Sequence, residues 1–285
     1  MDLARRRRGR GRGRGLALAL SGRPRPGAAV AQPRAGGDPG MTIAGKRVLI
    51  TGGGTGVGAD LARAFARAGA EVVICGRRKA PLEAVAEQTG ARALTADVTS
   101  EPSVKAMFAD AGPCDIVIAN AGAAESAPLG RTTLEQWNAM LAVNLTGTFL
   151  TFREGLAQLP GWGRLIAVAS TAGLRGYAYV APYAAAKHGV VGLVRSLALE
   201  VARRPVTVNA LCPGFLDTEM TARSIATIMD KTGKSREQAL AALTATNPQG
   251  RLIQPAEVSA AALWLCGPGS EGINGQAIAI AGGEA

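Results

Sequence analysis

The chain has 285 residues, enough for one α/β domain or two small ones, and its 47% apolar and 19% charged residues are typical of a packed globular protein. The formal charge of +11 is concentrated in residues 1–40, where ten Arg face two Asp; the remaining residues carry 22 Lys and Arg against 19 Asp and Glu, a net +3 that argues against a basic surface over the whole protein. Four cysteines without paired spacing, a single His and no run of about 18 apolar residues give no reason to expect a metal, a disulfide or a membrane span, so we expect a cytoplasmic protein.

Residues 1–40 combine an Arg/Gly repeat, a short LALAL segment and a run rich in Pro, Gly, Ala and Arg. Such a stretch cannot bury enough apolar surface to offset the entropy lost on ordering. We therefore expect a disordered basic tail, or translated sequence upstream of a start at Met41. A transit peptide and a nucleic-acid-binding arm are the alternatives.

From Met41 onward, short apolar runs alternate with helical patterns, and we expect a single domain over residues 41–285. Strand–helix alternation predicts the α/β class, with a Rossmann-like, doubly wound parallel sheet and helices on both faces. The predicted helices include 58–69, 133–159 and 181–203. The seven predicted strands cover residues 46–51, 71–75, 91–97, 115–120, 164–170, 206–212 and 277–282.

A glycine-rich turn, T-G-G-G-T-G-V-G at 51–58, lies between the first predicted strand and the first helix. Glycines let the backbone approach a pyrophosphate, whose charge then meets the free N–H groups of the helix start. A glycine-rich run alone can be a plain turn, but a strand before it and a helix after it favour dinucleotide binding. The candidate cofactor-binding residues of this turn are Gly52, Thr55, Gly56, Val57 and Gly58.

A second motif, Y-x-x-x-K, places Tyr183 and Lys187 on one face of the predicted helix 181–203. A free Tyr has a pKa of about 10, and a neighbouring cation favours the phenolate, so we expect Lys187 to lower the pKa of Tyr183. Ser170 closes the predicted strand 164–170. Strand ends and helix starts meet at the carboxyl edge of a doubly wound sheet, where ligands bind.

The T-G-x-x-x-G-x-G spacing and the separation of thirteen residues between Ser170 and Tyr183 resemble the short-chain dehydrogenase/reductase family, over about residues 41–285. The resemblance implies four catalytic residues. Ser170 would hydrogen-bond the substrate carbonyl, and Tyr183 would transfer a proton. Lys187 would also contact the nicotinamide ribose, and Asn144 would hold a water in the proton relay.

The same resemblance implies further cofactor contacts along the carboxyl edge of the sheet. One segment departs from the family pattern, because Ala119 stands where the family's N-N-A-G motif has its first Asn. This departure removes one polar group from the segment. The implied contacts are Asp97, Val98, Asn120, Gly122, Pro213, Gly214 and Thr218, together with Tyr183 and Lys187.

The choice of nucleotide depends on the end of the second predicted strand. The family position whose carboxylate selects NAD falls on Gly76, and Arg77 and Arg78 follow. A guanidinium can bind a 2′-phosphate through paired, charge-assisted hydrogen bonds, so we expect NADP(H) to be preferred over NAD(H), with Arg77 in the site. The alternative is that both arginines are simply solvated at a loop.

Phrases such as CPGFLDTEMT and GRLIQPAEV are similar to 3-oxoacyl-thioester reductases and aromatic-polyketide ketoreductases. We expect reduction of a 3-oxoacyl thioester on an acyl carrier protein or CoA, with the long segment 215–250 covering the substrate. Oxidation of a 3-hydroxyacyl-CoA or another secondary alcohol is the second hypothesis. A non-catalytic nucleotide-binding regulator with a basic nucleic-acid-binding arm is the third. The resemblance also implies a homotetramer, and we expect neither a membrane nor a nucleic-acid partner.

Overall fold

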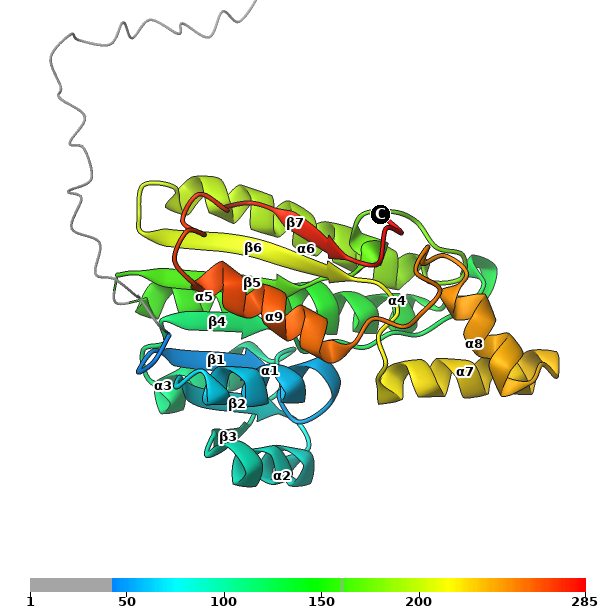
Figure 1. Cartoon of the computed structure of the whole chain (residues 1–285). Helices are drawn as coiled ribbons and strands as arrows, with labels where there is room; N and C mark the ends of the chain where they lie inside the picture. Colours follow the sequence, from blue (N-terminus) through cyan, green and yellow to red (C-terminus); the bar gives the residue numbers. More distant parts are fainter. Residues whose placement is uncertain (1–42, 160) are drawn as a thin grey trace, which may run out of the picture. The chain divides into compact units, whose positions relative to one another are not determined.

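The computed structural model describes residues 43–159 and 161–285, so the predicted basic tail at residues 1–40 lies outside the described residues. The described part contains a seven-stranded sheet in which every pair of neighbouring strands is parallel, with the order β3-β2-β1-β4-β5-β6-β7 (Figure 1). The predicted Rossmann-like sheet is therefore confirmed. The strands are β1 (Arg47–Thr51), β2 (Glu71–Gly76), β3 (Arg92–Thr95), β4 (Ile116–Ala119), β5 (Gly163–Val168), β6 (Val206–Pro213) and β7 (Ala277–Ile280).

The order of the strands reverses between β1 and β4. From β1 the chain adds β2 and β3 on one side, and from β4 it adds β5, β6 and β7 on the other. Ile50 of β1 lies opposite Ile118 of β4, so the two strands end at almost the same level. The loops that leave them diverge to opposite faces, which opens a crevice at the carboxyl edge.

Helices cover both faces of the sheet, because the strands are apolar on both sides and each face needs a cover. One core cluster joins α1 (Gly56–Arg67), α2 (Lys79–Thr89) and α9 (Pro255–Cys266) to the sheet through residues such as Phe65 and Leu265. The opposite cluster joins α3 (Glu101–Ala111), α5 (Gly147–Gln158) and α6 (Ala181–Val201) through Phe108, Phe152 and Val190.

The predicted helix at 133–159 is not one regular α-helix. It consists of α4 (Leu134–Leu141), a π-helical turn at Ala142–Thr146 and α5. A π turn carries one more residue than an α turn and often occurs at a functional site. Asn144 lies in the middle of this turn and is fully buried.

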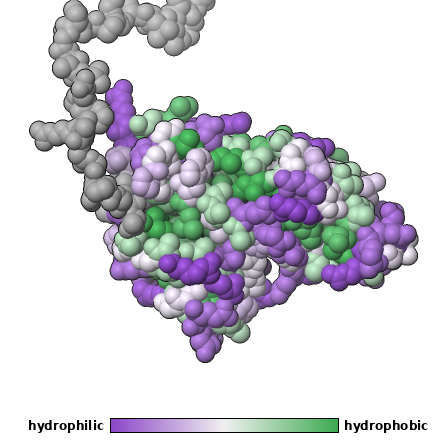
Figure 2. Space-filling model, in the orientation of Figure 1, coloured by the Kyte–Doolittle hydropathy of each residue, from purple (hydrophilic) through white to green (hydrophobic). Residues whose placement is uncertain are grey.

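The segment 215–250, called the lid segment below, holds α7 (Glu219–Thr232) and α8 (Arg236–Thr244). These helices bury few side chains and project from the carboxyl edge of the sheet (Figure 1). In Figure 2 the surface is hollowed between this lobe and the rest of the domain. Among the described residues, no helix is both long enough and apolar enough to span a bilayer.

Candidate active site

The glycine-rich turn follows β1 and begins α1, as the sequence predicts. Gly52 and Gly56 have φ angles of 66° and 53°, a region that favours glycine. A Cβ on Gly58 would lie 2.1 Å from the Gly52 carbonyl oxygen, so only glycine fits this position. Thr55 is the N-cap of α1, but its side chain makes no capping hydrogen bond, which leaves the first N–H groups available for an anion.

Val57 differs from its neighbours in the turn, because its side chain is buried in the core between α1 and the sheet. Only its backbone N–H can serve an anion at the helix start. The sequence alone could not show that the Val57 side chain belongs to the core while its backbone N–H belongs to the candidate site.

Thr51 and Asn120 connect the ends of β1 and β4. The Thr51 hydroxyl accepts the backbone N–H groups of Asn120 and Ala121, each at 3.0 Å. In return, the Asn120 amide donates to the carbonyls of Thr51 at 2.9 Å and Gly52 at 3.3 Å. The Asn120 side chain therefore stabilises the glycine turn directly, and its contact with a cofactor stays a prediction. Thr51 was not among the predicted site residues. The structure shows that it is a buried polar residue, 1% exposed, whose hydroxyl joins the two strand ends.

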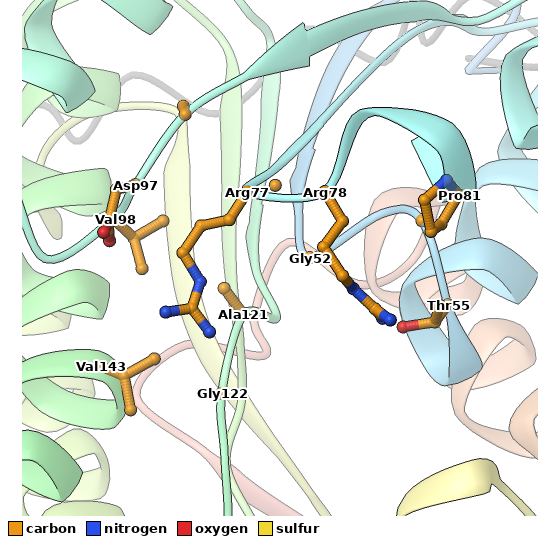
Figure 3. Close-up of a pocket in the computed structure, with 13 residues that line it drawn as sticks. Gly52, Thr55, Arg77, Arg78, Pro81, Asp97, Val98, Ala121, Gly122 and Val143 are labelled. Atoms are coloured by element: carbon orange, nitrogen blue, oxygen red, sulfur yellow. The ribbon is translucent and has the colours of Figure 1, made fainter. Parts of the chain in front are cut away.

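A pocket lies beyond the carboxyl ends of β1, β2, β3 and β4 (Figure 3). The guanidinium of Arg77 extends into it, while Arg78 points toward Thr55. Both arginines are exposed at the end of β2. The lining residues are Gly52, Gly54, Thr55, Gly76, Arg77, Arg78, Pro81, Ala96, Asp97, Val98, Ala121, Gly122 and Val143.

Asp97 and Val98 form the side of the pocket beyond β3. The Asp97 carboxylate accepts the backbone N–H of Thr99 at 2.9 Å and its hydroxyl at 2.7 Å. The hydrogen bond from the Thr99 N–H lowers the pKa of Asp97, and the charge of Arg77 adds to this effect. Asp97 is therefore a charged acceptor at the pocket, and Val98 is a buried apolar wall.

Ser170 and Tyr183 meet at the carboxyl edge beside β5. Ser170 follows the strand and accepts the N–H of Ala172 at 3.1 Å. Tyr183 lies in the first turn of α6. Burial raises the pKa of Tyr183, and a hydrogen bond with the Ser170 hydroxyl opposes this rise. The net pKa of Tyr183 is raised because burial of the phenolate dominates, and the expected lowering contribution of Lys187 stays a prediction.

Lys187 is buried one helical turn beyond Tyr183. Its Nζ lies 5.6 Å from the centroid of the Tyr183 ring and donates to the Val168 carbonyl at 2.8 Å. Burial lowers the pKa of Lys187 to about 8. The ammonium is thus held in place by a backbone carbonyl at the end of β5, in a surrounding that weakens its hold on the proton.

Asn144 joins this group from the π turn. Its amide donates to the Ala123 carbonyl at 2.9 Å, and its Oδ1 accepts the Ala123 N–H at 3.3 Å. A Cβ on Gly122 would lie 2.7 Å from the Asn144 Oδ1 and 3.7 Å from the Lys187 Nζ. Asn144 and Lys187 therefore both lie close to Gly122, which also lines the pocket, so the chain after β4 links the predicted catalytic residues to the pocket.

The last predicted contacts lie beyond β6. Pro213 ends the strand and is buried, and Gly214 donates its N–H to the Ile280 carbonyl at 3.0 Å. Thr218 is the N-cap of α7. A Cβ on Gly56 would lie 3.5 Å from the Thr218 Cγ2, so the start of α7 stands over the glycine turn.

The chain is similar over most of its length to several known proteins. The family described as Enoyl-(Acyl carrier protein) reductase matches residues 52–284. A 3-oxoacyl-(acyl-carrier-protein) reductase of Aquifex aeolicus is 35% identical, covering 85% of this chain and 98% of its own. A D-beta-hydroxybutyrate dehydrogenase of Cupriavidus necator is 34% identical, and the match covers 81% of this chain and 94% of that protein. The crystal structure of a variant actinorhodin polyketide ketoreductase with NADPH is similar, with a TM-score of 0.79, 34% identity, and coverage of 84% of this chain and 97% of that one.

Replacing Thr51 by Val should destabilise the protein and weaken dinucleotide binding together. The Val side chain fills the same space but leaves the N–H groups of Asn120 and Ala121 without their acceptor, which costs about 1–3 kcal/mol for a buried donor. Thermal unfolding should show a Tm lower by several degrees, and calorimetric titration should show a higher Kd for NADPH. Thr51→Ser, which keeps the hydroxyl, is the matched control. An unchanged Tm in Thr51→Val would contradict this role.

Proposed function

The chain belongs to the short-chain dehydrogenase/reductase family, and from this premise we propose that it uses NADP(H) to reduce the ketone of a 3-oxoacyl thioester to a secondary alcohol. The thioester would be carried by CoA or an acyl carrier protein. One observation carries the proposal: Tyr183, Lys187 and Ser170 converge at the carboxyl edge, next to a pocket that begins at the glycine turn.

The residues of the pocket fit a dinucleotide. The glycine turn packs closely against the chain after β4, since a Cβ on Gly52 would meet the Ala121 Cα at 2.9 Å. The start of α1 keeps its N–H groups free for a pyrophosphate. Arg77 is suited to a 2′-phosphate on the adenosine ribose. When bound, the cofactor supplies a hydride to the carbonyl carbon. Gly214 and Thr218 would hold its carboxamide end, as the family resemblance implies.

The protein's own groups would handle the proton and the developing charge. Ser170 donates a hydrogen bond to the substrate carbonyl, and Tyr183 donates the proton that its raised pKa keeps on the phenol at neutral pH. Lys187 places a positive charge beside the phenol, which stabilises the phenolate left after the transfer. Asn144 lies at the back of this group, where a water could return the proton.

The substrate class follows from the relatives rather than from a substrate-shaped cavity. A 3-oxoacyl reductase and a polyketide ketoreductase both act on acyl ketones, as their names say, whereas a D-beta-hydroxybutyrate dehydrogenase acts on a hydroxy acid. Oxidation of a 3-hydroxyacyl-CoA or another secondary alcohol is therefore the second candidate. A regulator without catalysis has no need for a phenol beside a buried ammonium, and we set it third.

We further propose that the protein acts in the cytoplasm as a homotetramer. The four cysteines are free and buried, as suits a reducing compartment. Apolar side chains are exposed on the outer helices: Phe149 on α5, Leu199 on α6 and Trp264 on α9. Contact between copies of the chain would cover them.

The reaction is tested with NADPH and a panel of 3-oxoacyl thioesters, simple ketones and secondary alcohols. We expect the thioesters to give the highest kcat/KM. Tyr183→Phe should lower kcat about 10²–10⁴-fold while leaving the Kd for NADPH nearly unchanged, because only the proton donor is lost. Tyr179→Phe is the matched control, since this exposed Tyr lies four residues before Tyr183, in the loop that leads into α6. A Tyr183→Phe enzyme that keeps more than about a tenth of kcat would refute the assignment.

The pH dependence should report Lys187. Its pKa is lowered to about 8, so the free enzyme loses the ammonium as the pH rises through that value. The raised pKa of Tyr183 keeps the phenol protonated over the same range. We therefore expect kcat/KM for NADPH, which reports the free enzyme, to fall above about pH 8. In Lys187→Met this fall should be absent, with a low and level profile; a level profile in the wild type would contradict the role of Lys187.

The cofactor preference should depend on Arg77. One charge-assisted contact to a 2′-phosphate corresponds to about a ten- to hundredfold preference for NADPH over NADH in kcat/KM, and Arg77→Ala should remove it. Gly76→Asp with Arg77→Ala should reverse the order; a Cβ on Gly76 meets only Leu82, at 3.8 Å, so the Asp can be accommodated. Arg67→Ala, at an exposed position at the end of α1, is the control. Equal use of the two cofactors by the wild type would overturn the preference and leave the reductase assignment in place.

A further inference from the structure

The chain beyond β7 turns back onto the loop between Ser170 and Tyr183, called the catalytic loop below. Gly282 and Gly283 make this turn with φ angles of 62° and 96°, which favour glycine. Glu284 follows and is only 9% exposed, unusual for a carboxylate without a partner. Its partner lies in the catalytic loop.

That partner is Tyr177. The Tyr177 hydroxyl donates to the Glu284 Oε1 at 2.5 Å and lies in hydrogen-bond contact with the Thr171 Oγ1 at 2.8 Å. Thr171 is buried and directly follows Ser170. Burial, and then the hydrogen bond to Glu284, raise the pKa of Tyr177 to about 12, so the phenol keeps the proton that makes this contact. A short hydrogen-bonded path thus runs from Glu284 to the residue beside Ser170.

Other contacts bring the start of the lid segment to the same place. Arg175 donates to the backbone carbonyl of Glu284 at 3.1 Å, and its guanidinium lies 5.3 Å from the centroid of the Tyr177 ring. The Tyr177 ring meets Phe215 edge to face, with centroids 6.5 Å apart. A Cβ on Gly214 would lie 3.1 Å from the Glu284 Oε2. Glu284 therefore contacts both the catalytic loop and the end of β6.

The catalytic loop needs such support because its own backbone is unfavourable at one point. Tyr179 has a φ of 67°, a left-handed conformation that a bulky residue adopts at a cost and keeps only when its surroundings impose it. Its carbonyl accepts the N–H of Ala127 at 2.8 Å. The side chain itself is exposed and contributes little packing.

We propose that Glu284 is a positioning residue, which acts through Tyr177 to hold the catalytic loop so that Ser170 and Tyr183 face the substrate carbonyl. The inference rests on the proposed function and adds to it a residue outside the Ser-Tyr-Lys group. Glu284 does not touch the reacting atoms. Its loss should therefore lower kcat by a larger factor than it raises the Kd for NADPH, which the neighbouring Gly214 would help to hold.

The test is a double-mutant cycle in the full chain with Glu284→Ala, Tyr177→Phe and both together. The substrate is acetoacetyl-CoA with NADPH, and Glu87→Gln, an exposed carboxylate on α2, is the control. Each single change should lower kcat about tenfold, as expected for one hydrogen bond to a charged group. The kcat of the double variant should be no lower than that of the less active single variant, because both changes remove the same interaction. Glu284→Gln keeps an acceptor oxygen and should recover most of kcat.

A Glu284→Ala enzyme with wild-type kcat would overturn the proposal, and so would losses of kcat that multiply in the double variant. A lower Tm with unchanged kcat would assign Glu284 to stability alone and also overturn it. Hydrogen exchange provides a measurement that does not depend on activity. The amides of residues 171–180 should exchange about tenfold faster in Glu284→Ala, and unchanged exchange would refute the positioning role. If the wild type reduces no carbonyl compound, the proposed function fails, and the exchange result still decides whether Glu284 orders the loop.

Discussion

The reciprocal hydrogen bonding of Thr51 and Asn120 is the interaction on which the site depends. It fixes the end of β1 to the end of β4, where the strand order reverses. On one side of this junction the glycine turn leads into α1, and on the other Gly122 lies close to both Asn144 and Lys187. The pocket for a dinucleotide and the group that would transfer the proton therefore share one support. A change at this junction would displace both.

The sequence predicts the sheet and most of the site because the relevant signals are local. Buried parallel strands read as continuous apolar runs, and each of the seven predicted strands corresponds to a strand of the structure to within a few residues at either end. The glycine turn is recognisable because its backbone tolerates no side chain at Gly58. Tyr183 and Lys187 are one helical turn apart, so their convergence follows from helix geometry alone.

The features that the sequence did not predict depend on contacts between distant segments. The π turn at Asn144 requires a hydrogen-bond register that no hydrophobic periodicity encodes, since α4 and α5 continue the same helical pattern on either side. The raised pKa of Tyr183 reflects desolvation of the phenol in the folded protein, whereas the motif shows only its neighbour Lys187. Glu284 lies 107 residues from Tyr177 along the chain, and nothing in its immediate sequence marks it as a partner.

The pairing of β1 with β4 also determines when the pocket can form during folding. The two ends that Thr51 and Asn120 join are 69 residues apart in sequence, and α1, β2, α2, β3 and α3 all lie between them. Closing so long a loop costs entropy before its contacts can repay it, and folding slows as such non-local contacts increase. We therefore expect the crevice to form later than the local turns of the helices that surround it. The binding pocket exists only once β1 and β4 are paired. A nucleotide added during refolding should therefore leave the early collapse of the chain unaffected and stabilise only the folded domain against unfolding.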